Sequence, residues 1–230
     1  MKIKSCRVCK SKKIDTVHSL GSMFFTGIFP KLKNNKVPKG ELKLIRCRKC
    51  CLLQLEDNFD SKLMYGDNYG YMSSLNKAME SHLQLKSKYL LDTYKLKKSS
   101  YILDIGSNDG TFLNFFNKNF KLFACDPTIK KFKNYYRKDI NLIPDFFSKD
   151  RFKDLKFNLI TSIAMFYDLP DPLKFAKDIK SVLSKEGIWH IEMSYMPSML
   201  NNISYDTICH EHLEYYSVKS LKHLMDLANL

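Results

Sequence analysis

Two cysteine pairs near the start of the chain have the spacing of a metal site. They are Cys6 with Cys9, and Cys47 with Cys50. Each pair places two thiolates on one tight turn, and four thiolates complete a tetrahedral Zn²⁺ site. Four protein ligands leave no open coordination position, so the predicted zinc is structural. Cys51, beside the second pair, is expected to be a spare thiol. The alternative is a chance pairing of free thiols.

A second segment combines an acid with glycines at the end of an apolar run. It reads D-x-G-x-N-x-G, whereas a dinucleotide-binding loop reads G-x-G-x-x-G. Its first carboxylate would repel a phosphate but suits a cationic ligand, and S-adenosylmethionine carries a sulfonium and an ammonium group. Asp126 ends the next apolar run, where an acid can bind the ribose hydroxyls. The predicted cofactor-binding residues are Asp104, Gly106, Asn108, Gly110 and Asp126. The alternative is an ordinary strand-to-helix turn.

Phe146 is the remaining candidate for cofactor binding. The run Asp145–Phe147 lies where a third strand would end, beside the adenine of a bound cofactor. The alternative is that these aromatic side chains simply belong to the core.

The segment Cys209–Tyr216 concentrates titratable side chains. On an extended backbone, His210 and His212 would lie on one face and Glu211 on the other. A histidine can remove a carbon-bound proton because its pKa lies near neutrality, and Glu211 could orient an imidazole or hold a substrate hydroxyl. The spacing does not match the H-E-x-x-H zinc motif. The alternative is a structural cluster of satisfied polar groups.

Alternating strands and helices follow from Ser100 onward and must position these residues. The expected strands are Tyr101–Ile105, Lys121–Cys125, Phe157–Ile163 and Gly187–Met193. The expected helices are Thr111–Phe120, Pro172–Leu183 and Val218–Leu230. This alternation predicts an α/β fold with a parallel, doubly wound, Rossmann-like sheet.

Three segments are expected along the chain. Residues 1–60 form a zinc-binding module that needs its metal because it is too short for a large core. Residues 61–99 form a connecting segment with a helix over Leu75–Leu96, and residues 100–230 form the cofactor-binding domain. The strands that usually complete such a sheet do not follow the last helix, so we expect a domain shortened at its C-terminal end.

The composition points to a globular chain in the cytoplasm. The chain has 230 residues, of which 44% are hydrophobic, and this is enough for a core. There is neither a long apolar run for a membrane span nor a signal-peptide pattern. The net charge of +14 is mostly lysine and is spread along the chain, which does not favour a nucleic-acid partner. The oligomeric state stays open.

These motifs together resemble the sugar C-methyltransferases that act on nucleotide-linked deoxysugars. The resemblance covers essentially the whole chain. Besides the cysteine pairs and the loop from Asp104 to Gly110, it runs through Tyr69–Asn76, Ser162–Asp168, Ser194–Leu200 and Cys209–Tyr216.

The resemblance implies S-adenosylmethionine and Zn²⁺ as cofactors and a 4-keto nucleotide sugar as substrate. It implies methylation through an enolate, with His212 as the base and Glu211 and His210 as its partners. Tyr71 and Ser73 would line the sugar site.

The chain departs from the resembled pattern at three places. Cys209 stands where type members have a tyrosine with an acid/base role. Phe166–Asp168 stands where they have a catalytic histidine, which makes Tyr167 the candidate there. We also expect the chain to lack the C-terminal domain of the type members. The identity of the sugar and of the nucleotide stays open, as does whether the methyl group goes to carbon or to oxygen. The alternatives are a nucleic-acid methyltransferase and an inactive remnant that binds only zinc.

Overall fold

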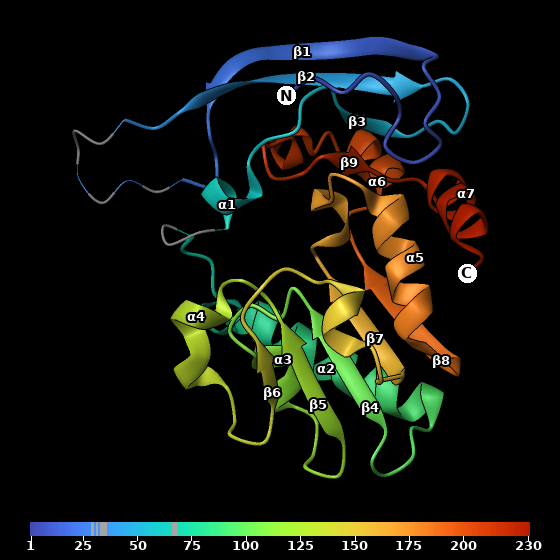
Figure 1. Ribbon diagram of the computed structural model, residues 1–230. Coiled ribbons are helices and arrows are strands. Elements are labelled where there is room, and N and C mark those ends of the chain that lie inside the picture. The colour runs from blue at the N-terminus through green and yellow to red at the C-terminus, as the bar shows by residue number, and fades with distance from the viewer. Residues whose placement is uncertain (29, 31, 33–35, 66–68) are drawn as a thin grey trace. The chain divides into compact units, whose positions relative to one another are not determined.

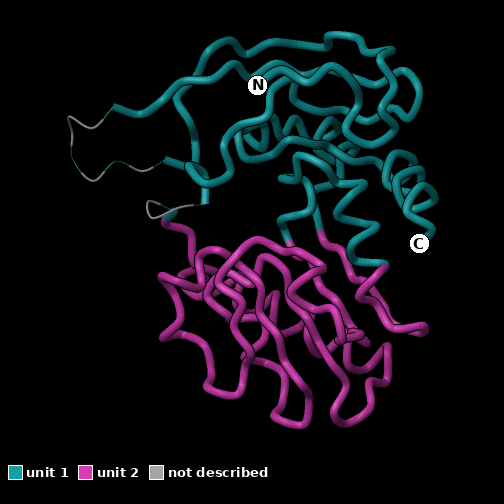
Figure 2. Tube along the Cα trace, viewed as in Figure 1, with its two compact units in different colours: residues 1–69, 164–180, 193–230 teal, residues 70–163, 181–192 magenta. Residues whose placement is uncertain are grey.

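The computed structural model describes residues 1–28, 30, 32, 36–65 and 69–230. The chain forms two compact units (Figure 2). Unit 1 contains residues 1–69, 164–180 and 193–230, and unit 2 contains residues 70–163 and 181–192. Unit 2 is therefore inserted in the sequence of unit 1.

Unit 2 is built on a parallel sheet of five strands in the order β6-β5-β4-β7-β8 (Figure 1). The strands are β4 (Tyr101–Ile105), β5 (Lys121–Cys125), β6 (Asn141–Ile143), β7 (Phe157–Ile163) and β8 (Leu183–Glu192). The strand order reverses direction at β4, and such a switch point is where ligands bind in doubly wound sheets. The predicted Rossmann-like α/β class is confirmed, and β8 begins earlier than expected.

The helices of unit 2 cover an apolar core. They are α2 (Lys77–Tyr94), α3 (Thr111–Asn114), α4 (Ile129–Phe132), and the 3₁₀ turns η1 (Ser73–Leu75), η2 (Lys133–Tyr135) and η3 (Lys149–Phe152). The core contains Leu90, Ile102, Phe116 and Leu122, each at most 1% exposed. The long helix expected over Leu75–Leu96 is confirmed as α2, whose N-terminus is capped by the Asn76 side chain.

The helix expected over Thr111–Phe120 is wrong in length, because α3 ends at Asn114. The guanidinium of Arg137 donates to the carbonyl oxygens of Asn114 and Phe116. Carbonyls at the end of a helix need such partners, so this side chain satisfies the last turn where the helix ends.

Unit 1 contains an antiparallel sheet of four strands in the order β1-β2-β3-β9. The strands are β1 (Ile14–Phe24), β2 (Lys39–Cys47), β3 (Leu53–Leu55) and β9 (Glu214–Tyr215). Its shorter elements are α1 (Ser61–Met64), η4 (Phe166–Asp168), α6 (Met196–Asn201), η5 (Tyr205–Thr207) and α7 (Val218–Ala228), and α5 (Pro172–Val182) begins in this unit. Gln54 pairs with Glu214, so the cysteine-rich segment and the segment after His212 share one sheet.

The buried side chain of Arg7 joins several parts of unit 1. It is 3% exposed and donates to the carbonyl oxygens of Leu55 and Asp57, at 2.6 and 3.0 Å, and to Asn58 Oδ1. Its Nε atom lies 3.5 Å from Oε1 of Glu214 on β9. Burial raises the pKa of Glu214 well above its usual value, and the charge of Arg7 acts in the opposite direction. The guanidinium therefore connects the first cysteine turn to β3 and β9.

None of the helices among the described residues is both long and apolar enough to span a membrane.

Arg7→Met should lower the free energy of unfolding by about 3–5 kcal/mol, because it removes the buried donors to the Leu55 and Asp57 carbonyls and the cation beside the buried acid Glu214. Arg48→Met is the matched control, since Arg48 pairs with Asp15 on the surface of the same unit. The free energy of unfolding should fall much less in Arg48→Met than in Arg7→Met. Urea unfolding followed by circular dichroism measures both variants, and equal losses would contradict the importance of the buried pair.

Candidate functional site

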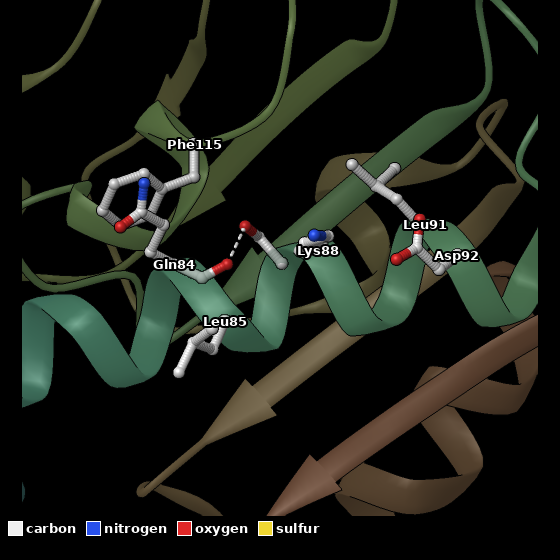
Figure 3. A pocket seen from close by; sticks show the side chains of 7 residues that line it. Gln84, Leu85, Lys88, Leu91, Asp92 and Phe115 are labelled. Carbon is white, nitrogen blue, oxygen red and sulfur yellow. Dashed lines mark hydrogen bonds between the residues drawn. The ribbon is translucent and has the colours of Figure 1, made fainter.

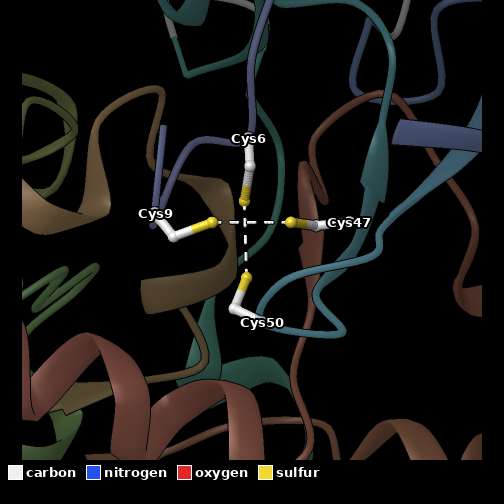
Figure 4. Close-up of side chains that lie close together, drawn as sticks. All are labelled: Cys6, Cys9, Cys47 and Cys50. Atoms are coloured by element: carbon white, nitrogen blue, oxygen red, sulfur yellow. Dashed lines mark hydrogen bonds between the residues drawn. The ribbon is translucent and has the colours of Figure 1, made fainter. Parts of the chain in front are cut away.

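The four predicted cysteine ligands converge in unit 1 (Figure 4). The Sγ atoms of Cys6 and Cys50 are 3.5 Å apart, and those of Cys9 and Cys47 are 3.4 Å apart. All four sulfur atoms lie within 4.8 Å of one another. A tetrahedron with Zn–S bonds of about 2.3 Å has S···S edges of about 3.8 Å, so the cluster fits a Zn²⁺ ion. The thiols are free and too far apart for disulfides.

The backbone forms the same turn at both cysteine pairs. The amide of Lys10 donates to the carbonyl of Cys6, and the amide of Cys51 donates to the carbonyl of Cys47, both at 3.0 Å. Lys10 and Cys51 have left-handed φ angles of 55° and 63°. Cys51 therefore ends the second turn and lies outside the sulfur cluster, as expected for a spare thiol. The hydrogen bond between Cys6 and Cys50 lowers the pKa of the Cys6 thiol to about 5 and raises that of Cys50, so Cys6 is the thiol of this pair that ionises first.

Cys47→Ser should lower the zinc content below that of the wild type and reduce thermal stability, because one of four ligands is lost. Cys51→Ser is the matched control at a neighbouring thiol and should keep the wild-type zinc content. Elemental analysis of the purified chain and thermal unfolding measure both effects. Equal zinc contents in the two variants would exclude Cys47 as a ligand.

The loop after β4 makes a tight turn in unit 2. Gly106, Asn108 and Gly110 have φ angles of 77°, 52° and 80°. A Cβ atom on Gly110 would lie 2.5 Å from the ring of Tyr136, so the backbone must approach that ring closely. The Tyr136 hydroxyl donates to the Asn108 carbonyl at 2.8 Å. The loop is thus held in one shape before α3 begins.

Two buried acids lie at the base of this loop. Asp104 is 3% exposed and accepts a hydrogen bond of 2.6 Å from the Thr161 hydroxyl. Asp126 is 8% exposed and accepts from the amides of Asn108 and Thr128, at 2.9 and 2.7 Å. Burial raises the pKa of Asp104 to about 7 and also raises the pKa of Asp126. Two carboxylates would repel a pyrophosphate, whereas they fit a cationic ligand such as S-adenosylmethionine.

The predicted substrate-binding residues lie beside the same loop. Asn108 Oδ1 accepts from the Ser73 amide at 3.0 Å, and its Nδ2 donates to the Tyr71 carbonyl at 3.1 Å. The side chain of Tyr71 is 45% exposed, and that of Phe146 is 40% exposed. Both aromatic rings are therefore open to a ligand in this unit.

The His210–Glu211 part of unit 1 is bent, so the expected placement of both histidines on one face is wrong. The His210 ring lies with its centroid 4.8 Å from each ring of Phe25 and Phe59, and its Nε2 donates to the Gly40 carbonyl at 3.2 Å. Sequence reasoning missed Thr26, whose hydroxyl donates to Glu211 Oε2 at 2.5 Å and lies 3.4 Å from Nδ1 of His210. His210 and Glu211 thus share a partner on the β1–β2 side.

Two glycines leave room for these side chains. A Cβ atom on Gly27 would lie 2.4 Å from Glu211 Oε1. A Cβ atom on Gly40 would meet the rings of Phe59 and Phe25, at 2.6 and 2.7 Å, and His210 Cδ2 at 3.3 Å. Gly27, after β1, and Gly40, within β2, therefore lie close against the side chains of His210 and Glu211.

His212 has a different environment. Its Nδ1 atom donates to the Thr207 carbonyl at 2.8 Å, which leaves Nε2 as the unprotonated nitrogen of the neutral ring. Its ring packs on Tyr167 with centroids 4.4 Å apart, and the Leu213 amide donates to the Tyr167 carbonyl at 2.8 Å. Burial lowers the pKa of His212. This imidazole is therefore neutral near pH 7 and able to accept a proton through Nε2.

Sequence reasoning also missed the pair of Tyr65 and Asp168. The Tyr65 hydroxyl lies 2.6 Å from Asp168 Oδ2 in unit 1. Asp168 follows β7 by a few residues, and an acid after the end of a parallel strand is a signal that could have marked it. Nothing in the sequence pairs it with Tyr65.

An open groove of about 410 Å³ lies along α2 in unit 2 (Figure 3). It is lined by α2 residues between Gln84 and Asp92 and by Phe115. None of the predicted site residues lines this groove.

Comparison with known families and proteins agrees with this architecture. Residues 75–230 match the family described as "Methyltransferase domain", and residues 6–65 match a family of zinc-binding domains. The chain is 24% identical over 238 residues to the C-methyltransferase NovU of Streptomyces niveus, covering 99% of this chain and 56% of NovU. It thus spans a little over half the length of that relative.

Solved structures share the fold. A chain from the complex between the Haloferax volcanii Trm112 methyltransferase activator and a methyltransferase has a TM-score of 0.56 and 17% identity, covering 67% of this chain and 72% of that one. YcgJ of Bacillus subtilis has a TM-score of 0.54 and 15% identity, covering 64% and 68%. The match of residues 75–230 covers more than half of the chain, and the cysteine cluster fits the zinc-binding family. The chain therefore belongs to the methyltransferase domain family, and it also carries a zinc-binding module.

Proposed function

We propose that the chain methylates a carbon atom beside the ketone of a nucleotide-linked 4-keto deoxysugar. The observation that carries the proposal is His212, a buried imidazole whose Nδ1–H is held by the Thr207 carbonyl and whose Nε2 is free to act as a base. The similarity to the C-methyltransferase NovU supports carbon as the acceptor. An imidazole base suits a proton beside a carbonyl, which is acidic enough for enzymic removal.

The residues of unit 1 would handle the proton. Nε2 of His212 takes the proton from carbon, and the electron pair of the broken C–H bond forms the enolate. The Thr207 carbonyl keeps the ring oriented and stabilises the imidazolium through Nδ1–H. Glu211, which acts on the pKa of His212 by its charge, favours the same protonated state. His210 has both ring nitrogens near partners, so we assign it a positioning role.

The residues of unit 2 would bind the cofactor. S-adenosylmethionine, when bound, supplies an electrophilic methyl group, which the enolate carbon receives. Asp104 would balance the positive charge of the cofactor, Asp126 would accept from the ribose, and Phe146 would contact the adenine. Tyr71 and Ser73 would line the sugar site beside the same loop.

The zinc-binding module would support the catalytic segment. Residues 1–60 supply β1, β2 and β3, and β3 pairs with the strand that follows His212. Residues 61–99 would connect this module to a cofactor-binding domain of residues 100–230. Thiolate ligands persist in a reducing compartment, so we place the chain in the cytoplasm.

His212→Ala should lower the rate of methyl transfer by about 10²–10⁴-fold, the usual contribution of a general base. Because the cofactor-binding residues are elsewhere, the Kd for S-adenosylmethionine should change little. His18→Ala, on the exposed strand β1, is the control and should keep the wild-type rate. Transfer of labelled methyl to dTDP-4-keto-6-deoxyglucose and isothermal titration measure the two quantities. An active His212→Ala variant would refute the assignment of the base.

S-adenosylmethionine should bind more tightly as the pH rises through about 7, because the pKa of Asp104 is about 7 and its ionised form attracts the cationic ligand. The affinity should change by about tenfold for each unit by which the cofactor lowers that pKa. Asp104→Asn should remove this pH dependence, whereas Asp154→Asn, an exposed acid of the same unit, should keep it. Isothermal titration from pH 5.5 to 8.5 measures the dependence, and a flat wild-type profile would show that Asp104 does not act on the cofactor.

A further inference from the structure

The pair of Tyr65 and Asp168 lies in the same unit as His212 but has no part in the proton removal just described. Asp168 Oδ2 lies 2.6 Å from the Tyr65 hydroxyl. Asp168 Oδ1 is inaccessible to water and has no hydrogen-bond partner among the described residues. Asp168 follows Tyr167, whose ring contacts His212. A buried carboxyl group with a single partner, this close to the base, needs an explanation.

The surroundings of Asp168 favour a neutral carboxyl group. Burial raises its pKa well above the usual value, and the charge of Glu211 raises it further, while the hydrogen bond with Tyr65 opposes them. The acidic groups on which Asp168 acts in turn are Cys209, Glu214 and Tyr215. A buried acid without a basic partner keeps its proton rather than lose solvation.

Protonation reverses the direction of the hydrogen bond. The distance of 2.6 Å suits either direction, because it joins two oxygen atoms. An ionised Asp168 would accept the Tyr65 hydroxyl hydrogen and leave the phenol nothing to donate. A proton on Oδ2 makes Asp168 the donor to Tyr65, and the phenol hydrogen is then free for another acceptor. A proton on Oδ1 would instead be buried with no hydrogen-bond partner among the described residues, so Oδ2 is the favoured position.

We propose that Tyr65, held by a protonated Asp168, is a further catalytic residue that donates a hydrogen bond to the substrate carbonyl oxygen. This inference rests on the proposed function. As His212 removes the proton, the C–H electron pair forms a C=C bond and the carbonyl π electrons move to oxygen. That oxygen accepts the Tyr65 O–H. The enolate carbon bonds to the methyl group as the methyl–sulfur bond breaks, and the electron pair of that bond would stay on the sulfur of the cofactor. The carbonyl then forms again, so Tyr65 and Asp168 keep their protons and the proton on His212 passes to water.

The neighbouring thiol is a poorer candidate for this role. Burial raises the pKa of Cys209 to about 12, and a thiol is a weak hydrogen-bond donor. A phenol that is itself hydrogen-bonded to an acid donates more strongly, because linked hydrogen bonds polarise one another. Asp168 is then a positioning residue that acts through Tyr65.

Tyr65→Phe tests the donor. With dTDP-4-keto-6-deoxyglucose, kcat should fall by about 10²–10³-fold, the usual effect of removing one donor to a developing oxyanion, while KM changes little. Deuterium exchange from solvent into the carbon beside the ketone should slow by a similar factor, because it needs the same enolate. Tyr205→Phe, a substitution on the surface of the same unit, is the control. Unchanged kcat and exchange in Tyr65→Phe would overturn the proposal.

Infrared spectroscopy tests the protonation of Asp168 without any turnover. The difference spectrum between the wild type and Asp168→Asn at pH 7 should contain the band of a protonated carboxyl group, and a carboxylate band instead would overturn the proposal. Asp206→Asn, at an exposed acid of unit 1, should give the carboxylate band. A wild-type chain that neither exchanges nor methylates the sugar would contradict the proposed function, and the infrared result would still decide the state of the pair.

Discussion

The guanidinium of Arg7 is the interaction on which unit 1 depends. It follows the first metal ligand in sequence, donates to carbonyl oxygens at the end of β3, and faces the carboxyl group of Glu214 on β9. Two residues before Glu214 lies His212. A single buried cation therefore links the first cysteine turn, the end of β3 and the strand that follows His212.

The same physical effect, loss of solvation, raises the pKa of a buried acid in each unit. Asp104 in unit 2 and Asp168 in unit 1 each have one side-chain hydroxyl partner, Thr161 and Tyr65, and burial raises the pKa of both. At Asp104, whose pKa is about 7, a cationic ligand can draw the carboxyl group into its ionised form, whereas Asp168 keeps its proton. A neighbouring acid adds to the effect of burial at both sites, Asp126 at Asp104 and Glu211 at Asp168.

Unit 2 could be predicted from sequence much better than unit 1. The strands β4, β5 and β7 have the predicted bounds, because buried parallel strands are short apolar runs ended by glycine or an acid. In unit 1, β1 is mostly exposed and shows no such run, and β3 pairs with a strand about 160 residues away. The bend at His210 and Glu211 depends on Thr26, Gly27 and Gly40, and Tyr65 lies 103 residues from Asp168. No local pattern encodes such contacts.

The pairing of β3 with β9 also sets an order of events during synthesis. The four thiols leave the ribosome long before the strand that completes their sheet, because all of unit 2 is translated in between. Strand pairing across such a separation is slow to form. The metal can bind first and hold the early strands β1, β2 and β3 together, so the availability of zinc at that moment would determine how much of the nascent chain reaches its final sheet.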